Sequence, residues 1–527
     1  MYDTLIINGT LIDGTGNPRR SGDIAITDGK ISAIGKLAGQ PAKRIIDAAG
    51  LIVSPGFIDV HSHSDVTVPL NPRFDSTIRQ GITTEVVGNC GNSAAPFAAG
   101  AGSGFGSFGD GAPSGERTLA EHIRHLESTG FSANMAWLVG HNTIRSLAGV
   151  TGDSPTEAQY LEMERLLHQT FLDGAIGFSS GLEFEPGRTC KPEELLRLTA
   201  IVKEYDGMYT SHIRNRDAGV LEALDEFLQT VEAHSLRAQV SHLNIRHNTH
   251  APQNAFEKCV AKLQAARDKG LDVLTDMTPL NYGIGMMSGI LPKWLTAAQP
   301  GKLRELLLDP QTRARLRTDC DRYWRFITNG EWERVRMQNN PAYPEINGLT
   351  FPEIAKLWNK DPWDCYFDIL AGAAPDINSV ILVSYLFTDE HLRETIVHPL
   401  YMLVVDGYSS SASGEVAKYT QFPLHYIGMT WFLTHHVRTM GTLSPEEAIR
   451  KMTSMPAAHF RLGKRGLLAE GYEADICVFD YEGLESPFDL QKPAQYAKGV
   501  KYVLVNGTFV LDNGEHTGAL PGKTIKR

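Results

Sequence analysis

Eight short apolar runs, separated by segments of helical periodicity, occupy the middle of the chain. The runs that we expect to form strands are Phe57–Val60, Thr83–Val87, Met135–Val139, Ala175–Ser179, Met208–Ser211, Ala238–Ser241, Asp272–Thr275 and Met402–Val405. Strands that alternate with helices form parallel sheets, and eight such units close into a (β/α)8 (TIM) barrel. Such a barrel takes roughly 250 residues or more, so 527 residues leave room for a second domain. We predict an α/β fold with the barrel over residues 55–464.

Both ends of the chain are rich in short β-like runs. The dipeptides Asn8-Gly9, Asp28-Gly29 and Asn506-Gly507 lie between such runs, and Asn-Gly and Asp-Gly are typical of two-residue hairpin turns. Two β fragments that flank an α/β middle most simply form one small sheet domain together. We therefore assign residues 1–54 and 465–527 to a single domain.

The interval between the seventh and eighth predicted strands is too long for one crossover connection. Residues 281–400 contain five tryptophans, at positions 294, 324, 332, 358 and 363. We predict a helical insertion here, and a lid over the barrel mouth is one hypothesis for its role. Two helices elsewhere have clear start signals, in Ser154-Pro155-Thr156-Glu157 and Ser444-Pro445-Glu446-Glu447. Each signal places a cap, a proline at the first helical position and a glutamate three residues after the cap.

Composition excludes several classes of partner. A net charge of -11 argues against nucleic acid or an acidic membrane as the main partner, because both require a basic face. No basic leader begins the sequence, and no apolar run approaches the roughly 18 residues of a membrane span. The six cysteines have no paired spacing, which favours a reducing cytoplasm over a disulfide framework. We expect a cytoplasmic protein with a small-molecule substrate, and a homo-oligomer remains open.

One glycine-rich segment imitates a cofactor motif. Gly104-Phe105-Gly106-Ser107-Phe108-Gly109 matches a dinucleotide-binding pattern, but no strand precedes it and no helix follows it. We interpret this segment as a loop.

Metal-competent side chains follow five of the predicted strands. They are His61 and His63 after the first strand, Cys90 after the second, His212 after the fifth, His242 after the sixth and Asp406 after the eighth. In a (β/α)8 barrel the active site lies at the carboxyl ends of the strands, so these six side chains should meet there. In an extended chain, residues two apart point to the same side, which lets His61 and His63 bind one ion.

The six side chains divide by role. Cys90, His212 and His242 would hold one Zn²⁺, while His61, His63 and Asp406 would hold a second. Zinc lowers the pKa of water to about 7, and Asp406 would then be the general base. The structural alternatives are a small buried cysteine, satisfied core histidines, and a turn-forming aspartate before Gly407.

Several motifs resemble the amidohydrolase superfamily and, within it, the N-acyl-D-amino-acid deacylases (D-aminoacylases). They include SPGFIDVHSHSD, GITTEVVGNCGNSAAP, GAIGFSSGLEFEPG, YTSHIR, VSHLN and EEAIRKMTSMPAAHFRLGKRGLLAEGYEADICVFD. The resemblance spans nearly the whole chain and implies a zinc-dependent amide hydrolase with a β-sandwich built from both termini. Cys90 stands where this subset has its cysteine ligand. The fourth strand lacks the carboxylated lysine found in many members of the superfamily.

Three positions depart from the pattern of the resembled family. Asn244 replaces a lysine after the strand-six histidine, and the segment from Tyr408 to Ser413 replaces a His-Pro-Arg sequence. The segment MTPLNYGIG after strand seven is also altered. Our candidates for substrate binding are Arg214, Asn244, Tyr282 and His141, with Arg216 and Arg246 as further cations that are otherwise solvated surface charges.

The leading hypothesis is therefore metal-dependent hydrolysis of an amide bond, with an N-acyl-D-amino acid or a related N-acyl compound as substrate. The second hypothesis is a cyclic amide or lactone hydrolase, because the same metal chemistry acts on any polarised carbonyl. The third is a non-catalytic scaffold of the same fold.

Overall fold

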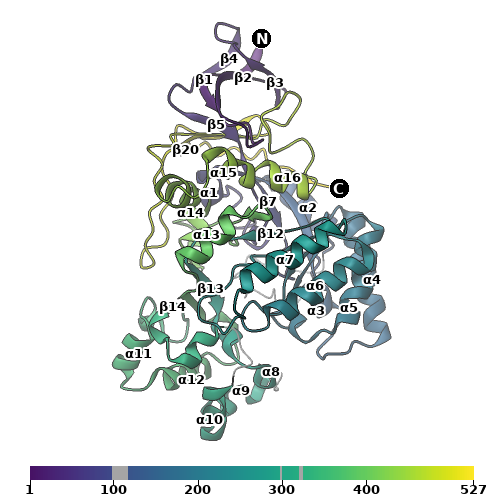
Figure 1. Ribbon diagram of the computed structural model, residues 1–527, viewed down its shortest axis with the longest axis vertical. Helices are drawn as coiled ribbons and strands as arrows, with labels where there is room; N and C mark the ends of the chain where they lie inside the picture. Colours follow the sequence, from purple (N-terminus) through teal and green to yellow (C-terminus); the bar gives the residue numbers. More distant parts are fainter. Residues whose placement is uncertain (98–116, 297–299, 320–323, 420) are drawn as a thin grey trace.

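The computed structural model describes residues 1–97, 117–296, 300–319, 324–419 and 421–527. The molecule is elongated, with a sheet from both ends of the sequence at one end of the long axis, the barrel in the middle and the insertion at the other end (Figure 1). The glycine-rich motif at residues 104–109 and Cys320 lie outside the described residues. Within the described ranges, no helix is both long enough and apolar enough to cross a membrane.

Eight parallel strands form the barrel, in the order in which they occur in the chain. They are β6 (Phe57–Asp59), β7 (Ile82–Val87), β8 (Asn134–Gly140), β9 (Gly177–Gly181), β10 (Met208–His212), β11 (Arg237–Val240), β12 (Val273–Met277) and β16 (Tyr401–Leu403). The first and last strands meet through the residues just beyond them. The amide of Asp406 donates to the carbonyl of His61 at 3.0 Å, and the amide of His63 donates to that of Gly407 at 2.7 Å. The predicted (β/α)8 fold is confirmed.

Both faces of the barrel strands are buried. Val86 and Leu138 belong to one apolar cluster, while their neighbours Val87 and Val139 belong to another. Successive side chains of a strand point to opposite faces, so the two clusters lie on the two sides of the sheet.

The outer side of the barrel is covered by helices, of which α6 (Val220–His234) is representative. Its buried side chains include Leu224, Phe227 and Val231, at the i, i+3 and i+7 spacing that places residues on one helical face. Truncating a buried side chain such as Phe227 to alanine would cost about 3–5 kcal/mol. The helices that carry the outer layer between strands β8 and β12 are α3 (His141–Leu147), α4 (Glu157–Asp173), α5 (Pro192–Glu204), α6 and α7 (Ala255–Asp268).

The two helix start signals have different outcomes. Ser444 caps α15 (Pro445–Met452) and accepts a hydrogen bond from the amide of Glu447 at 3.2 Å, as predicted. The other cap was misplaced, because α4 begins at Glu157 and its cap is Thr156 rather than Ser154. Thr156 forms a reciprocal capping box with Gln159, which satisfies two backbone donors and outcompetes the earlier serine.

Strands from both ends of the chain form one sheet, in the order β20-β19-β18-β17-β5-β1-β2-β3, with β4 beside β1. Its strands are β1 (Tyr2–Leu11), β2 (Arg20–Thr27), β3 (Lys30–Gly35), β4 (Ala42–Asp47), β5 (Ile52–Pro55), β17 (Ile476–Phe479), β18 (Val500–Val505), β19 (Thr508–Asp512) and β20 (Glu515–His516). The junction is the antiparallel pair β5 and β17, in which Ile476 lies opposite Pro55. This sheet joins the two predicted terminal fragments, while the exact domain boundaries remain a prediction.

Two of the three predicted hairpin turns are confirmed. Asp28-Gly29 and Asn506-Gly507 join consecutive antiparallel strands and have positive φ at both residues, as a two-residue turn of this type requires. The prediction for Asn8-Gly9 was wrong, because β1 continues through both residues. Asn8 has a φ of 61°, and the pairing with β2 shifts register there, so the dipeptide forms a bulge.

The insertion is a mixed α and β unit rather than a purely helical one. Its three-stranded antiparallel sheet contains β13 (Tyr282–Met286), β14 (Val335–Asn339) and the central β15 (Ile381–Tyr385). The sequence of β15, ILVSY, contains β-branched side chains, which favour strands. The prediction of a helical insertion relied on the tryptophans and overlooked this signal. Its α-helices are α8 (Lys293–Thr296), α9 (Leu303–Leu308), α10 (Pro310–Thr318), α11 (Phe351–Trp358) and α12 (Pro362–Ala373), and α13 (Asp389–Val397) then leads into β16.

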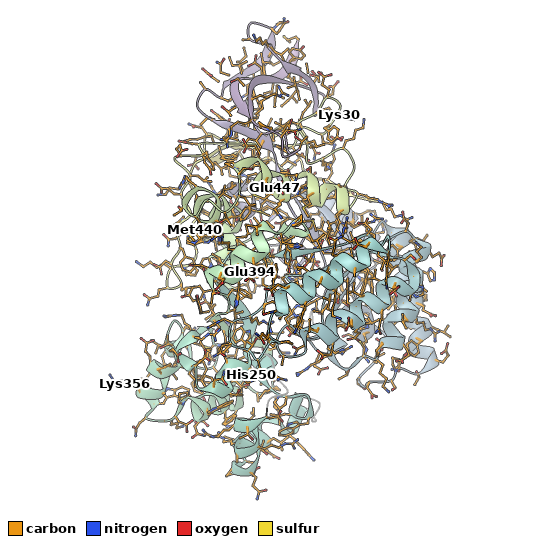
Figure 2. The ribbon with its side chains drawn as sticks, in the orientation of Figure 1. Lys30, His250, Lys356, Glu394, Met440 and Glu447 are labelled. Atoms are coloured by element: carbon orange, nitrogen blue, oxygen red, sulfur yellow. The ribbon has the colours of Figure 1, made fainter. Side chains whose placement is uncertain are left out.

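The insertion has its own aromatic core and contacts the barrel. Trp332 packs with ring centroids 4.8 Å from Phe351 and 5.0 Å from Trp363. In the loop after β11, His250 lies where the barrel meets the insertion, and its Nε2 is 3.2 Å from Oδ1 of Asn329 (Figure 2). These contacts place the insertion at the carboxyl end of the barrel strands.

Candidate metal centre

The chain turns sharply where the candidate residues follow the strands. Cys90, His242 and Asp406 have φ values of 51°, 36° and 53°, in the left-handed region that residues other than glycine rarely adopt. Such strain persists only where the surrounding structure enforces it, and it clusters at functional sites. These turns aim three side chains from strands β7, β11 and β16 into the barrel mouth.

The six predicted metal ligands come together. The Sγ atom of Cys90 lies 3.2 Å from Nε2 of His61, 3.4 Å from Nε2 of His242 and 3.5 Å from Nδ1 of His212. The same Nε2 atom of His61 lies 3.3 Å from Oδ1 of Asp406, which is also 3.4 Å from Nε2 of His63. The donor atoms of His61, Cys90, His242 and Asp406 all lie within 4.8 Å of one another.

These separations fit a shared zinc ion. Tetrahedral zinc with Zn–N distances of 2.0–2.1 Å and Zn–S of 2.3 Å places its ligand atoms about 3.3–3.6 Å apart. Sγ of Cys90 is as close to His61 as to His212 and His242. The predicted division into two separate ligand sets, one with Cys90 and the other with His61, is therefore not visible in the geometry.

The donor atoms have the charges that a metal ion prefers. Burial would raise the pKa of Cys90, but the positive charges of His61 and His212 outweigh it and hold that pKa well below the ordinary value of a thiol. Burial would likewise raise the pKa of Asp406, and here His61 and His63 keep it below the ordinary value of a carboxyl. The cluster thus holds a thiolate and a carboxylate next to imidazole rings, and a metal ion can replace the ring protons.

Buried acids behind the cluster orient its histidines. Oε2 of Glu183 accepts a hydrogen bond from Nε2 of His212 at 2.7 Å. Oδ1 of Asp276 accepts one from the amide of His242 at 2.6 Å. A carboxylate bonded to the far ring nitrogen, as Glu183 is here, fixes the ring orientation of a metal-binding histidine, whereas Asp276 holds the backbone at His242.

Sequence reasoning missed Glu183 and Asp276. Glu183 follows β9 at the same end of the barrel as the other candidates, so the strand-end rule that found the histidines also finds it. Asp276 is the next-to-last residue of β12 and directly follows the run Asp272–Thr275 that was predicted as a strand, so the same rule finds it as well.

A cavity of about 410 Å³ opens onto the cluster. One wall contains His63, Cys90, His212, His242 and Asp406, and the insertion supplies apolar side chains on other walls. These apolar residues include Ile284, Met286, Trp324, Ile381 and Leu386. A substrate with a polar reacting group and an apolar portion would match both surfaces.

Arg216 and Arg246 line this cavity. Arg246 is 3% exposed and donates to Oε2 of Glu183 at 2.9 Å and to Oδ1 of Asp217 at 3.2 Å. Nη1 of Arg216 donates to Nδ1 and to the carbonyl oxygen of His242, at 2.8 and 3.0 Å. The alternative of solvated surface charges is therefore wrong for Arg246, which is buried in the site.

The four residues predicted to bind substrate do not line the cavity. Arg214 instead forms two hydrogen bonds of 2.8 Å with Glu226, on the outer side of the barrel. Asn244 is buried, and its Nδ2 donates to the carbonyl of Thr278 at 3.4 Å. The conformation of the loop after each strand determines the direction in which these side chains point. The rule that residues after a barrel strand reach the active site does not predict that direction.

The other two residues predicted to bind substrate, His141 and Tyr282, instead contact side chains of the protein itself. Nε2 of His141 lies 2.6 Å from Oε1 of Glu194, fully buried. Tyr282 packs against the rings of Tyr385 and Phe488, at 5.5 and 5.7 Å.

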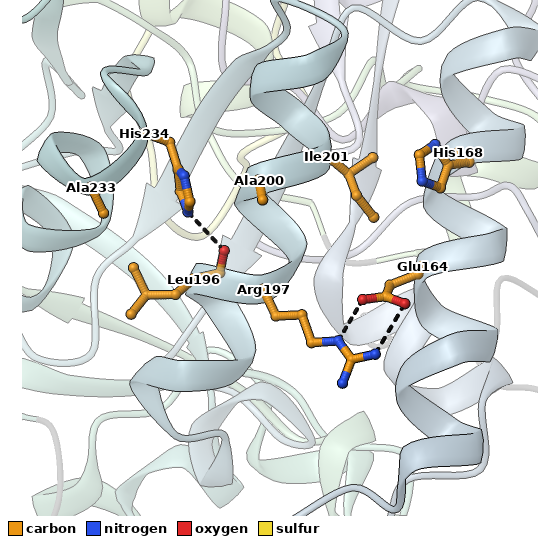
Figure 3. A pocket seen from close by; sticks show the side chains of 8 residues that line it. All are labelled: Glu164, His168, Leu196, Arg197, Ala200, Ile201, Ala233 and His234. Carbon is orange, nitrogen blue, oxygen red and sulfur yellow. Dashed lines mark hydrogen bonds and ion pairs between the residues drawn. The ribbon is translucent and has the colours of Figure 1, made fainter.

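A second hollow lies between three outer helices of the barrel, lined by Glu164 and Arg197 among others (Figure 3). Its charged and polar groups already pair with one another. Nε of Arg197 donates to Oε1 of Glu164 at 2.5 Å, and Nε2 of His234 donates to the carbonyl of Leu196 at 2.9 Å. This groove has no cluster of reactive groups, whereas the cavity at the barrel mouth opens onto one.

The chain is similar in sequence to known proteins. The sequence model of the family described as "Amidohydrolase family" matches residues 44–307 and 421–511. N-acyl-D-glutamate deacylase of Alcaligenes xylosoxydans xylosoxydans is 30% identical over 531 residues, which cover 100% of this chain and 96% of that protein.

Solved structures extend the similarity to the whole fold. N-acyl-D-glutamate deacylase from Bordetella bronchiseptica, complexed with zinc and a phosphonate inhibitor, superposes with a TM-score of 0.83 at 28% identity, over 100% of both chains. A D-aminoacylase whose binuclear metal centre has been characterised gives a TM-score of 0.82 at 25% identity, also over 100% of both chains.

Proposed function

This chain belongs to the amidohydrolase family, and we propose that it is a zinc-dependent enzyme that hydrolyses the amide bond of an N-acyl compound, with N-acyl-D-amino acids as the first substrate class. The observation that carries the proposal is the sulfur of Cys90 held within 3.5 Å of ring nitrogens of His61, His212 and His242. The deacylase activity of the relatives, which match this chain over its whole length, supports the substrate class.

The metal would be held by six side chains at the strand ends. They are His61, His63, Cys90, His212, His242 and Asp406. Zinc, when bound, supplies a Lewis acid that polarises a carbonyl and makes water acidic enough to react at neutral pH. The zinc in one similar structure and the binuclear centre in another support one or two ions per chain.

Asp406 is the general base in this proposal. Its side chain is 29% exposed, whereas that of His61 is fully buried, so its carboxylate reaches the cavity while it contacts the cluster. The low pKa of Asp406 keeps it deprotonated and ready to accept a proton from water. The same carboxyl can then deliver this proton to the leaving nitrogen.

Arg216 is the cation best placed for a substrate carboxylate. It lies at the cavity beside His242, and its nearest acid, Glu183, is 3.7 Å away and already bonded to Arg246 and His212. A guanidinium binds a carboxylate through two parallel hydrogen bonds. The apolar wall from the insertion would take the side chain or the acyl group.

Metal analysis and turnover together test the proposed function. We expect zinc in the wild-type protein, hydrolysis of one or more N-acetyl-D-amino acids, and loss of zinc and activity in Cys90→Ala. Cys259→Ala is the matched control, because Cys259 is buried on α7, away from the cluster. If the zinc-loaded protein cleaves only cyclic amides, the proposed substrate class is wrong and cyclic amides take its place. If the wild-type protein binds no metal, the proposed mechanism is wrong.

We also propose a cytoplasmic location and leave assembly as a prediction. Five cysteines within the described ranges are buried and unpaired, which suits a reducing compartment. Cell fractionation tests the location, and light scattering tests for a homo-oligomer.

A further inference from the structure

His425 is a buried histidine at the cavity that the proposed mechanism does not use. It lies near the start of α14 (Leu424–Trp431), is 3% exposed and lines the cavity beside the turn after β16. Its ring packs against Tyr408, with centroids 4.4 Å apart. A Cβ atom on Gly407 would lie 2.5 Å from Cδ2 and 3.1 Å from Nε2 of His425. Only glycine at 407 therefore lets this edge of the imidazole lie over the residue next to Asp406.

Neither ring nitrogen of His425 has a hydrogen-bond partner among the described residues. Nδ1 is sealed from solvent and unpaired. Other buried histidines do find partners, since Nε2 of His436 donates to the carbonyl of Pro279 at 2.7 Å and Nε2 of His459 to that of Ala238 at 3.1 Å. His122 is also unpaired, but it is enclosed between the rings of Phe97 and Trp137.

The cavity distinguishes His425 from His122. A buried polar group without a partner costs about 1–3 kcal/mol. At His425 a bound molecule can supply a partner for Nε2, because Nδ1 is the enclosed nitrogen and the ring lines the space in which a substrate would lie.

The ring is neutral, and its proton can be assigned. Burial lowers the pKa of His425 to about 3, against the opposing effect of Asp406 and with a further contribution from His63. A neutral imidazole has one N–H donor and one acceptor nitrogen. A buried N–H without an acceptor is rarer than a buried acceptor without a donor. The proton therefore belongs on Nε2, at the edge over Gly407, and the enclosed Nδ1 keeps its lone pair.

We propose that His425 donates a hydrogen bond from Nε2 to the carbonyl oxygen of the scissile amide, an inference that rests on the proposed amide hydrolysis. As the oxygen of water adds to the carbonyl carbon and Asp406 takes the proton of that water, negative charge moves onto the carbonyl oxygen. A donor fixed in place before the reaction stabilises this charge without reorganisation, and loss of one such donor typically lowers kcat by 10²–10³-fold. His425 would thus be a catalytic residue on the side of the cavity next to Asp406.

Zinc-loaded His425→Phe and His425→Met, which lack the donor, and His425→Gln, which retains an N–H, test this role. The substrate is the N-acetyl-D-amino acid that the wild type hydrolyses best. We expect kcat to fall about 10²-fold in the Phe and Met variants with KM within threefold, because the donor acts on charge that develops only in the transition state. The Gln variant should recover at least tenfold of this loss.

A second readout separates catalysis from packing. The N-(methylphosphonyl) analogue of the same D-amino acid carries charge where the tetrahedral intermediate does, and its affinity should fall by the same factor as kcat/KM. His436→Gln is the control, a buried histidine outside the cavity, and should keep wild-type kcat. A purely structural role would lower analogue affinity and kcat/KM by unequal factors, or leave the Gln variant as weak as Phe, and either result would overturn the inference.

Failure of the proposed function would look different. A zinc-loaded wild type that cleaves no N-acyl compound would overturn the proposed hydrolysis of N-acyl substrates. Wild-type turnover with an unchanged kcat in both donor-free variants would overturn only the role of His425.

Discussion

Nε2 of His212 donates a hydrogen bond of 2.7 Å to Glu183, and Nδ1 of the same ring lies 3.5 Å from the sulfur of Cys90. The proton on Nε2 leaves the Nδ1 lone pair directed at the metal cluster. Burial would raise the pKa of Glu183, but Arg246 and His212 outweigh burial and hold it well below its ordinary value. Glu183 is therefore held as a carboxylate that accepts from His212, and it acts on the metal through that ring.

Glu183→Gln should weaken zinc binding about tenfold or more, because the amide loses the charge that orients His212 and balances Arg246. Competition with a chelator measures the affinity. Glu226→Gln is the matched control, since Glu226 pairs with Arg214 outside the cavity. Equal zinc affinity in the wild type and Glu183→Gln would show that this carboxylate does not support the site.

Gly181→Ala should lower the zinc content of the protein. A methyl group at 181 would overlap the carbonyl oxygen of Cys90, and backbone atoms cannot move away cheaply. We expect displacement of the Cys90 turn and less than half the wild-type zinc content by elemental analysis. Gly152→Ala provides the comparison, because its methyl group would meet no atom within 4 Å. Full zinc occupancy in Gly181→Ala would contradict the rigid position of this turn.

Arg216→Met should raise KM about tenfold for an N-acetyl-D-amino acid but leave KM for the matching carboxamide within threefold, because only the acid carries the charge that Arg216 would bind. Arg214→Met serves as control and should change neither KM, since Arg214 lies outside the cavity. If KM rises equally for acid and carboxamide, Arg216 does not recognise the carboxylate.

Acid should destabilise the fold through His122. Burial lowers the pKa of this ring to about 4, below the 6.5 of an unfolded histidine, so the unfolded chain binds the extra proton. The stabilising contribution is complete above pH 6.5 and is lost as the pH falls toward 4. Between pH 7 and pH 4.5 the loss is about 2 kcal/mol.

Urea unfolding at pH 7 and pH 4.5 measures this effect. His122→Phe should reduce the difference between the two pH values by about 2 kcal/mol. The buried His436, whose pKa is also lowered to about 4, contributes the same trend in both proteins and so cancels in the comparison. An unchanged pH dependence in His122→Phe would show that His122 is not protonated on unfolding.

The barrel and the cluster followed from the sequence because both depend on short-range rules. Apolar runs fix the strands, and the residue just past each run reaches the mouth, which located His61, Cys90 and Asp406. Arg214 and Arg216 show the limit of this reasoning. They lie two residues apart in one loop, but Arg214 turns outward to Glu226 on α6 and Arg216 turns inward to His242.

Contacts that are remote in sequence decided the remaining errors. Asn8-Gly9 has the residues of a hairpin turn, but β1 continues through it, because β2 pairs along one side while β4 pairs up to Ile7 and β5 from Thr10 on the other. His425 lies within a helical pattern, and only the return of the chain after β16 brings it over Gly407. Neither feature can be predicted from the local pattern of apolar and polar residues.

The pairing of β5 with β17 has a consequence for biosynthesis. The two strands are separated by roughly 400 residues, so at about 5–20 residues per second the ribosome needs roughly 20 s or more to deliver the second strand. Throughout that time one edge of β5 has no partner, and exposed strand edges invite pairing with other chains. The nascent protein is therefore expected to depend on chaperones that shield its first residues until its last strands emerge.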